Sequence, residues 1–502
     1  ELFTPENNVP NTDQLSEWLD VWQNSLEPND AIIALTRGGF DDPYHAVDLL
    51  EGLRNSHFYH AFTRMGRDRL DRLMPAALAQ CSESHQPMTA LTRLISVIEA
   101  IGRRSAYLAL LSENPLALSQ LIKLITASQS INSWISQHPV ILDELLDPIS
   151  SYQVQSENEI GIELAGKLTF SSPLDLEVLM DQLREFRQGH TLRLAAADVA
   201  NIVSQTEVSD SLCSLAEVLL AQSLKFSAAS LQPESSSIDI QGIGVIAYGK
   251  LGSRELGYNS DLDLIFIFEN PIKSPEAGLY NRYSRLLQRL IHILTTRTSA
   301  GQLYEIDTRL RPDGRSGIVI NPVNSFLNYQ LKKAQVWEHQ ALVRARMIVG
   351  SESLTTAFNN CRHRVLCLAR NETELRNSVI SMRSKIIREN CRSTGEEYDL
   401  KVDRGGLLDI EFLLQYLILR WANQYPQLTK GTKNKTLIRA LVDTRILAFP
   451  DGEILGTILD KYLRTENLLK LQEKSILIPK ETLIEERKWV SQLWQRLLEP
   501  YC

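Results

Sequence analysis

Residues 249–269 read GKLGSRELGYNSDLDLIFIFE, and this stretch decides the central part of the fold. A glycine-bearing turn leads into an apolar run that begins with two aspartates. Side chains at positions i and i+2 of a strand point the same way, so Asp261 and Asp263 share one face while Leu262 and Leu264 occupy the other. The stretch therefore predicts a strand that carries two carboxylates side by side near its start.

Two further runs of strand character lie on either side of this stretch. They are IGVIAYG at 243–249 and LYEIDTRLR at 303–311. A helical stripe in YSRLLQRLIHILTTR, at 283–297, separates the second and third runs. Together these segments predict a compact α/β unit with its core at about residues 240–350.

The third predicted strand adds Asp307 to the two aspartates. Strand alternation places Glu305, Arg309 and Arg311 on the same side as Asp307. Carboxylates this close repel one another unless a cation lies between them or one is protonated, and Mg²⁺ prefers such hard oxygen ligands. Asp261, Asp263 and Asp307 are therefore the candidate catalytic and metal-binding residues, suited to two metal ions acting on a triphosphate.

Phosphate contacts are expected from the residues around these carboxylates. Guanidinium groups bind phosphate oxygens in pairs, which makes Arg309, Arg311 or Arg315 candidates for nucleotide binding. Gly252 and Ser253 in the turn would let the backbone approach the phosphates, with amide groups at a helix start as donors.

Composition limits the class of protein. The chain has 502 residues with 53 basic and 61 acidic side chains, a net charge of -8, which argues against a nucleic-acid-binding role. We find no apolar run of about 18 residues and no signal-peptide pattern, so we expect no membrane span and no export. The 6 cysteines form no metal-binding spacing and indicate free thiols in a reducing cytoplasm.

The order of turn, D-x-D strand, helix and third-carboxylate strand resembles the polymerase-beta-type nucleotidyltransferase superfamily. The amino-acid sequence itself resembles glutamine synthetase adenylyltransferase more closely. Four segments carry this resemblance: AYGKLGSRELGYNSDLDLIF, LYEIDTRLRPDGRSG, WEHQALVRARMIVG and DRGGLLDIEF. These blocks span about residues 245–415. The resemblance implies that Asp261, Asp263 and Asp307 bind the metal and that Gly252 and Ser253 form the nucleotide turn.

The resemblance also implies a function. Members of the family carry two similar domains, one that adds AMP to a tyrosine of glutamine synthetase and one that removes it by phosphorolysis. The segments ELGYNSDLDL and WEHQALVRAR are similar to the C-terminal half of family members, which adds AMP. Since the chain begins at Glu1 and not at Met, we expect a piece of a longer polypeptide, the adding half with the linking helical region, and whether a second catalytic half precedes Glu1 stays open.

We predict a mainly α fold with a central α/β nucleotidyltransferase domain, a mixed sheet of polymerase-beta type, flanked by helical domains. Helical spacing runs through residues 12–146 and returns from about residue 322, notably at 407–424 and 454–472. The predicted domains are a helical regulatory or linker region, a nucleotidyltransferase domain with a helical lead-in, and a C-terminal helical bundle, at residues 1–150, 151–352 and 353–502.

A second cluster of candidates follows the D-x-G-G-x-x-D-I-E-F pattern of the family. Glycines before a helix permit close approach of a ligand, and nearby acids can position a ribose, a metal or a protein substrate. Acids in the first turn also favour the helix dipole without any ligand, so both interpretations stay open. The cluster consists of Asp403, Gly405, Gly406, Asp409 and Glu411.

Three remaining polar residues receive no site assignment. We expect the lone His339 to be a packed or surface side chain. We expect Arg344 and Arg346 to lie in a helical segment, where salt bridges are as natural as phosphate contacts.

The leading hypothesis is Mg²⁺-dependent transfer of AMP from ATP to glutamine synthetase, with the PII signal protein as regulator in the cytoplasm. Two enzymatic alternatives stay open, the AMP-removing half and a relative that uridylylates the PII protein. A catalytically inactive regulatory docking module is the alternative from another class.

Overall fold

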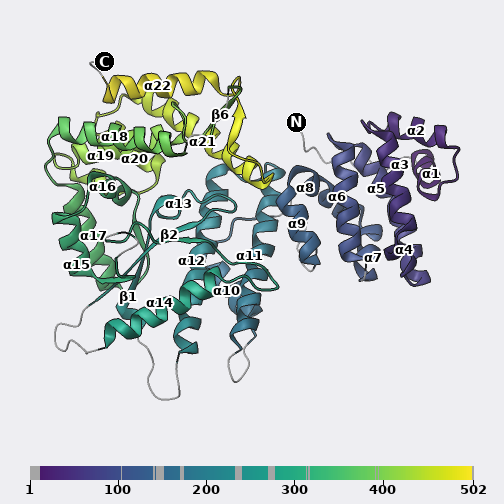
Figure 1. The fold of residues 1–502 in the computed structure, drawn as a ribbon, viewed down its shortest axis with the longest axis horizontal. Helices are drawn as coiled ribbons and strands as arrows, with labels where there is room; N and C mark the ends of the chain where they lie inside the picture. Colours follow the sequence, from purple (N-terminus) through teal and green to yellow (C-terminus); the bar gives the residue numbers. More distant parts are fainter. Residues whose placement is uncertain are drawn as a thin grey trace. The chain divides into compact units, whose positions relative to one another are not determined.

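The computed structural model describes residues 12–102, 104–139, 142, 152–169, 175–231, 240–269, 278–312, 314, 317–390, 392–393 and 395–499. These residues are mainly helical, with a small mixed sheet (Figure 1). This confirms the coarse fold prediction, and the polymerase-beta type stays a prediction. Arg315, a candidate for nucleotide binding, lies outside the described residues.

The chain divides into two compact units. The first comprises residues 1–153, 188–204 and 471–473, and the second comprises residues 154–187, 205–470 and 474–502. The three domains predicted from the sequence stay a prediction.

The first unit is built from short helices. Proline occupies the first helical position of several of them, where its missing N–H costs no hydrogen bond, as at Pro28, Pro43, Pro87 and Pro115. Helix α5 packs against α1 and α7, and α6 packs against α8 and α9. The helices are α1 (Thr12–Gln23), α2 (Pro28–Arg37), α3 (Pro43–Asn55), α4 (His57–His60), α5 (Arg64–Ser82), α6 (Pro87–Ile101), α7 (Ser105–Glu113), α8 (Pro115–Ala127) and α9 (Gln129–Gln137).

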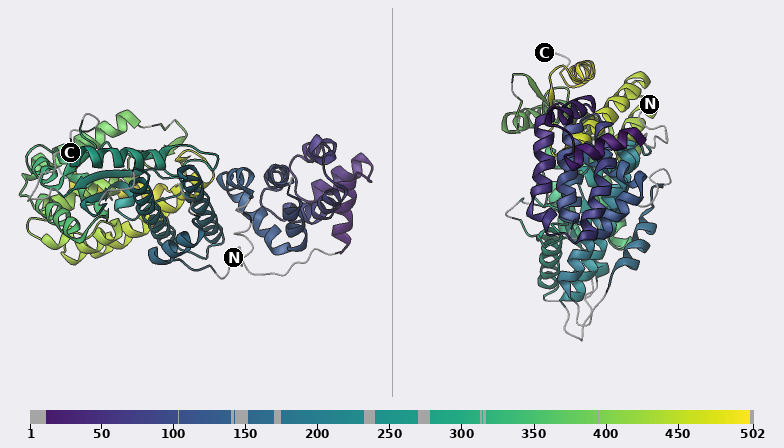
Figure 2. Two further views of the ribbon diagram at one scale, coloured as in Figure 1. Left: turned by 90° about the horizontal axis from the view of Figure 1, so that it is seen from below. Right: turned by 90° about the vertical axis from the view of Figure 1, so that its right-hand side faces the viewer.

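The second unit contains the sheet and the helices that cover it, seen from other directions in Figure 2. Its first helices are α10 (Glu157–Lys167), α11 (Leu176–Val199), which also contributes to the first unit, and α12 (Gln205–Ser230). The sheet region comprises η3 (Ile240–Gly242), β1 (Ile243–Ala247), α13 (Gly249–Gly252), β2 (Leu262–Phe268), α14 (Leu279–Thr295), β3 (Ile306–Asp307), β4 (Ile320–Pro322), α15 (Val323–Lys332), α16 (Val336–Val343) and β5 (Arg346–Val349).

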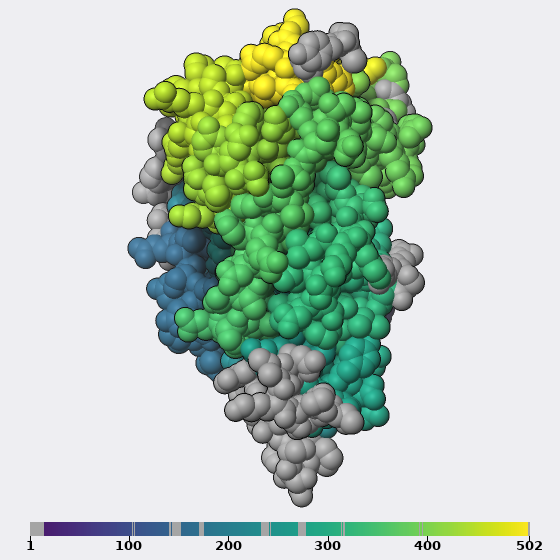
Figure 3. Space-filling view, turned by 90° about the vertical axis from the view of Figure 1, so that its left-hand side faces the viewer, coloured from purple at the N-terminus to yellow at the C-terminus, as the bar shows by residue number. Residues whose placement is uncertain are grey.

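The C-terminal part of the second unit is again mostly helical. Figure 3 shows one face of the molecule, on which these green and yellow segments lie next to the teal segments of the sheet region. They are α17 (Glu352–Leu366), α18 (Glu372–Asn390), β6 (Glu397–Asp399), α19 (Leu407–Trp421), η5 (Pro426–Thr429), α20 (Asn434–Asp443), α21 (Phe449–Leu471), β7 (Leu477–Pro479) and α22 (Ile484–Leu498).

Strand order in the sheet is β3-β2-β1-β5, and β4 also pairs with β2. Strand β2 is antiparallel to β1 and parallel to both β3 and β4. All residues of β1 are buried, as are the apolar residues of β2, because helices cover the sheet. The sheet thus holds the start of β2, where the aspartates lie, in a rigid setting.

The expectation of helix alone after residue 322 is wrong. Arg346–Val349 forms β5, which pairs with β1, and a second sheet joins β6 to β7. Four-residue apolar runs such as RMIV do not distinguish strand from helix by periodicity, and the partner of β5 lies about a hundred residues earlier in the chain. The predicted helices at 407–424 and 454–472 correspond to α19 and α21.

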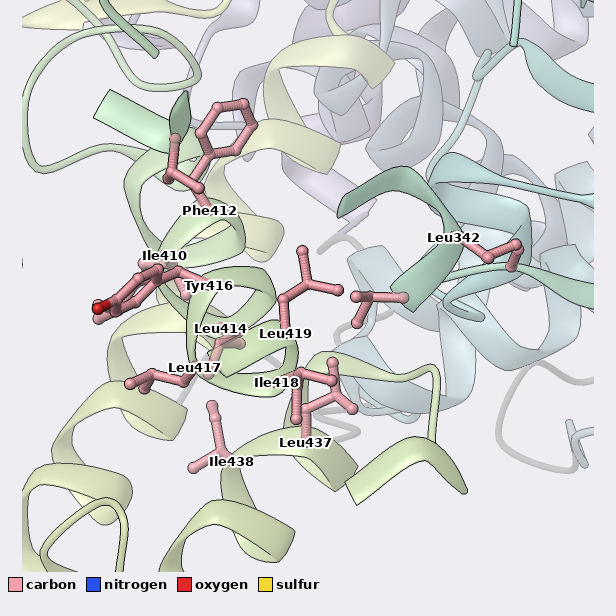
Figure 4. Packing of buried hydrophobic residues seen from close by; sticks show 14 of the residues in the cluster. Leu342, Ile410, Phe412, Leu414, Tyr416, Leu417, Ile418, Leu419, Leu437 and Ile438 are labelled. Atoms are coloured by element: carbon pink, nitrogen blue, oxygen red, sulfur yellow. The ribbon is translucent and has the colours of Figure 1, made fainter. Parts of the chain in front are cut away.

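Helix α19 is the centre of a large apolar core in the second unit. Ile410, Leu414 and Ile418 are fully buried along it, and Leu437 of α20 packs against the same cluster (Figure 4). The cluster extends to Ile265 in β2. The sheet and the C-terminal helices therefore share one continuous core.

One helix of the described residues, α12, has the length and hydropathy of a membrane span. A bent pair, Ala106–Glu113 with Pro115–Ala127, passes the same test only if it is counted as one span. In α12, 78% of the apolar window is buried inside the protein, as is typical of a core helix. The prediction that the chain has no membrane span stays a prediction.

Candidate active site

The three predicted aspartates come together at one edge of the sheet. Asp263 of β2 and Asp307 of β3 are direct register partners in the parallel pair. Asp261 precedes β2 by one residue and faces the same open cleft as Asp307, which has a volume of about 650 Å³. The cleft is lined by Asp261, Glu305, Ile306, Asp307, Thr308, Arg309 and Arg311.

Electrostatics supports the same grouping. Burial and, to a smaller extent, the charges of Asp261 and Asp307 raise the pKa of Asp263 to about 6, while Arg344 and Lys401 act in the opposite direction. A shift with these causes is typical of neighbouring carboxylates that share one site. The nearby cationic side chains therefore do not fully balance the negative charge of the three aspartates.

Gly249 forms the wall behind Asp263. Its φ of +52° is unfavourable for other residues, and a Cβ there would lie 2.0 Å from Oδ2 of Asp263. The glycine at the start of the turn thus makes room for the carboxylate.

Arg309 and Arg311 do not lie on a strand, which corrects the prediction. Strand β3 ends at Asp307, because its Oδ1 accepts a hydrogen bond of 2.8 Å from the backbone N–H of Arg309 and so starts a turn. The guanidinium of Arg309 donates to Oδ2 of Asp307 over 2.6 Å. Arg311 donates to the carbonyls of Thr308 and Gly317 and so stabilises the turn.

The predicted nucleotide turn is held by the protein's own groups. Ser253 is fully buried, and its Oγ accepts a hydrogen bond of 2.8 Å from Arg344. A Cβ at Gly252 would lie 2.2 Å from the carbonyl oxygen of Arg344 and 2.6 Å from that of Ala247. Gly252 thus permits close approach of the chain to itself, and the nucleotide contacts of both residues stay a prediction.

The second candidate cluster separates into structural residues and one residue that reaches the turn. Asp409 is buried between Arg383, whose Nε lies 2.5 Å from it, and the backbone N–H of Gly405. Asp403 accepts hydrogen bonds from the backbone N–H of Asp399 and from Ser393. These two acids therefore stabilise the start of α19 and the turn before it.

The two glycines of the cluster are required by backbone packing. Gly405 has a φ of +84°, and a Cβ there would lie 2.2 Å from the carbonyl oxygen of Arg487. A Cβ at Gly406 would lie 2.5 Å from the carbonyl oxygen of Leu400. Close approach at both positions is to the chain's own backbone.

Glu411 is the member of the cluster that connects to the active site. It pairs with Arg344 over 2.6 Å, and Arg344 also contacts Ser253 and lies 3.4 Å from Glu255. Arg344 is nearly fully buried and belongs to the charges that act on Asp263. Sequence patterns left Arg344 without an assignment, because its partners lie 67 and 91 residues away along the chain.

The other two unassigned residues have structural roles. His339 is buried, its Nε2 lies 2.8 Å from the carbonyl oxygen of Gln330, and burial lowers its pKa. Arg346 pairs with Glu217 of α12 over 3.2 Å. Of the two predicted possibilities for His339, packed or at the surface, the structure shows the packed one.

Whether the carboxylates suit a metal ion depends on Arg309. Among the described residues, no three His, Cys, Asp or Glu side chains already stand in the arrangement of a metal ligand set. Arg309 forms an ion pair with Asp307. The side chain of Arg309 is 65% exposed, and ion pairs at such exposed positions are weak. The donors are hard carboxylate oxygens, the type that Mg²⁺ prefers, and a divalent cation that displaces Arg309 stays a prediction.

A mainly helical protein with a small mixed sheet and three aspartates at its edge has the features of a nucleotidyltransferase. A family model described as glutamate–ammonia ligase adenylyltransferase matches residues 118–361. Glutamate–ammonia ligase is another name for glutamine synthetase. The chain is similar to this adenylyltransferase family over these residues.

Relatives with curated names extend the match to nearly the whole chain. Proteins of Nitrosococcus oceani, Thioalkalivibrio sulfidiphilus and Pseudomonas putida are 40%, 38% and 36% identical over 97%, 95% and 96% of the chain. Each is named bifunctional glutamine synthetase adenylyltransferase/adenylyl-removing enzyme. The chain covers 52%, 51% and 52% of their lengths and so spans about half of each relative.

Proposed function

We propose that the chain transfers AMP from ATP to a tyrosine hydroxyl of glutamine synthetase and releases pyrophosphate. The observation that carries the proposal is the pairing of Asp263 with Asp307, together with the raised pKa of Asp263. The relatives' shared name gives the group and the protein substrate.

We propose Mg²⁺ as the cofactor, held by Asp261, Asp263 and Asp307. When bound, the cation would polarise the phosphate and neutralise charge on the leaving group. Asp263 must lose its proton to bind it, so a pKa of about 6 leaves the carboxylate available at neutral pH. Arg309, once released from Asp307, has two parallel N–H donors for a phosphate group.

A second candidate is removal of AMP by phosphorolysis. The names of the relatives include both activities, and the chain spans about half of each. Addition of AMP is the leading proposal, because the segment ELGYNSDLDL is similar to the half of family members that adds AMP.

The test is incubation of the chain with glutamine synthetase, Mg²⁺ and ATP labelled at the α-phosphate, followed by mass analysis of the modified residue. Label on a tyrosine supports the proposal. Phosphate-dependent release of AMP from modified glutamine synthetase would instead assign the removing activity. Transfer of UMP from UTP to the PII protein would assign the uridylylating alternative, and the absence of Mg²⁺-dependent ATP binding would assign an inactive docking module.

We propose the PII signal protein as the regulator and the cytoplasm as the location, on the family resemblance alone. If PII regulates the chain, its addition changes the initial rate of AMP transfer to glutamine synthetase. An unchanged rate, with glutamine present or absent, would contradict this part of the proposal.

A further inference from the structure

Three lysines from separate segments lie beside the acidic edge of the sheet. Lys250 belongs to α13, Lys401 follows β6, and Lys470 is near the end of α21. Lys250 contacts Oε1 of Glu466, and Lys470 lies 3.5 Å from the same oxygen. Lys401 is close enough to affect the pKa values of both Glu466 and Lys470.

The buried carboxylate of Glu466 lies among the ammonium groups of this lysine cluster. Glu466 is 1% exposed, and although burial opposes ionisation, Lys250 and Lys470 hold its pKa at about 2. Burial and the charge of Lys250 lower the pKa of Lys470 to about 8. Two ammonium groups therefore share one carboxylate and a third lies near it, a local arrangement that favours binding of an anion.

The lysine cluster is continuous with the candidate active site. The ammonium of Lys470 donates a hydrogen bond of 3.1 Å to Oγ of Ser260, the residue before Asp261. Lys401 is among the charges that act on Asp263. Lys250 directly follows Gly249, which packs against the carboxylate of Asp263.

We propose that Lys250, Lys401 and Lys470 form a phosphate subsite for the β- and γ-phosphates of ATP, and hence for free pyrophosphate or inorganic phosphate. The inference rests on the proposed nucleotidyl transfer and assigns the lysines to the part of the substrate that leaves. Glu466 competes with the anion for two of the ammonium groups, and phosphate oxygens take over part of this pairing when the anion binds. Ammonium groups are common phosphate ligands, acting as point charges.

The test is calorimetric titration of the full chain with pyrophosphate and, separately, with orthophosphate, both without glutamine synthetase. Lys250→Met and Lys470→Met should each weaken binding about tenfold, the loss expected for one charge-assisted hydrogen bond. Lys461→Met is the matched control on α21, because Lys461 is exposed and pairs with Glu486. If the variants bind only one of the two anions more weakly than the wild type does, that anion is the one that the subsite binds.

Glu466→Gln separates a binding role from a structural one. Removal of its charge should strengthen binding of the anion several-fold, whereas loss of a purely structural contact would weaken binding or leave it unchanged. Unchanged affinity for both anions in Lys250→Met and Lys470→Met, or weaker binding in Glu466→Gln, would overturn the inference.

This assay is independent of the proposed activity. If AMP transfer is absent but the lysine variants lose affinity for either anion, the proposed function fails and the phosphate subsite stands. If AMP transfer occurs and the variants bind both anions as the wild type does, the subsite alone fails.

Discussion

Asp263 and Asp307 lie directly opposite each other in the parallel pair of β2 and β3. Two carboxylates held in register by backbone hydrogen bonds cannot separate to reduce their repulsion without breaking the sheet. A proton, a guanidinium or a metal ion must therefore balance their charge, and each of these leads to a measurable property of the protein.

The first prediction concerns stability in the absence of divalent cations. The pKa of Asp263 is raised to about 6 in the folded state, above an unfolded value of about 3.9. The contribution of Asp263 to stability is therefore fully present below pH 4 and lost as the pH rises through 6. From pH 4 to pH 7.5 in EDTA, the free energy of unfolding should fall by about 2 kcal/mol relative to Asp263→Asn.

Urea denaturation of both proteins at several pH values checks this prediction. A difference between wild type and Asp263→Asn that does not change over this range would show that Asp263 does not carry a raised pKa. Excess Mg²⁺ should reduce the pH dependence, because a bound cation replaces the proton.

The second prediction concerns Gly252. Replacement by Ala places Cβ 2.2 Å from the carbonyl oxygen of Arg344 and 2.6 Å from that of Ala247. Both are backbone atoms, so neither can move aside as a flexible side chain could. Gly252→Ala should lower the free energy of unfolding by at least about 2 kcal/mol. Gly456→Ala in α21 is the matched control, because nothing lies within 4 Å of its Cβ position. The control should be neutral or slightly stabilising, and equal effects of the two substitutions would contradict the close packing of the turn.

The third prediction concerns the buried Arg344. Arg344→Met removes the partner of Glu411 and the donor to Ser253, which leaves charged and polar groups unpaired. We expect a loss of about 3 to 5 kcal/mol in the free energy of unfolding. Arg496→Met serves for comparison, since Arg496 makes an exposed pair with Asp451. Its loss should cost less than about 1 kcal/mol. Similar losses in both variants would contradict the role of Arg344 in holding the turn.

The fourth prediction concerns Arg309, which competes with a cation for Asp307. Arg309→Gln should strengthen Mg²⁺ binding a few-fold in the absence of nucleotide, because the competing guanidinium is gone. Calorimetric titration with MgCl₂ measures this effect. Arg282→Gln in α14 is a control outside the cleft. Weaker Mg²⁺ binding in Arg309→Gln would show that Arg309 supports the metal site and does not compete with it.

Local sequence patterns predicted the parts of the site that depend on strand alternation. The D-x-D spacing placed Asp261 and Asp263 at the start of a strand. The run LYEIDTRLR placed Asp307 in the third strand. The end of β3 was not predictable in this way, because the side chain of Asp307 caps a turn and takes the backbone N–H of Arg309 out of the strand pattern.

Contacts between distant segments could not be predicted from one sequence. Arg344 contacts Ser253 across 91 residues, and Lys250 contacts Glu466 across 216 residues. No local pattern marks such pairs, since they depend on how α13, α19 and α21 pack around the sheet. The two glycines before α19 show the same limit, because their close neighbour is the chain's own backbone and the motif alone left a ligand equally possible.

The central claim is that the Asp263–Asp307 pair is the centre of AMP transfer. The most direct test compares wild type, Asp263→Asn and Asp307→Asn for transfer of α-labelled AMP to glutamine synthetase in Mg²⁺, with Asp451→Asn on the surface as control. Both active-site variants should lose at least about a thousandfold in rate, some 4 kcal/mol of transition-state stabilisation, while the control retains the wild-type rate. Transfer at the wild-type rate by Asp263→Asn or Asp307→Asn would contradict the account.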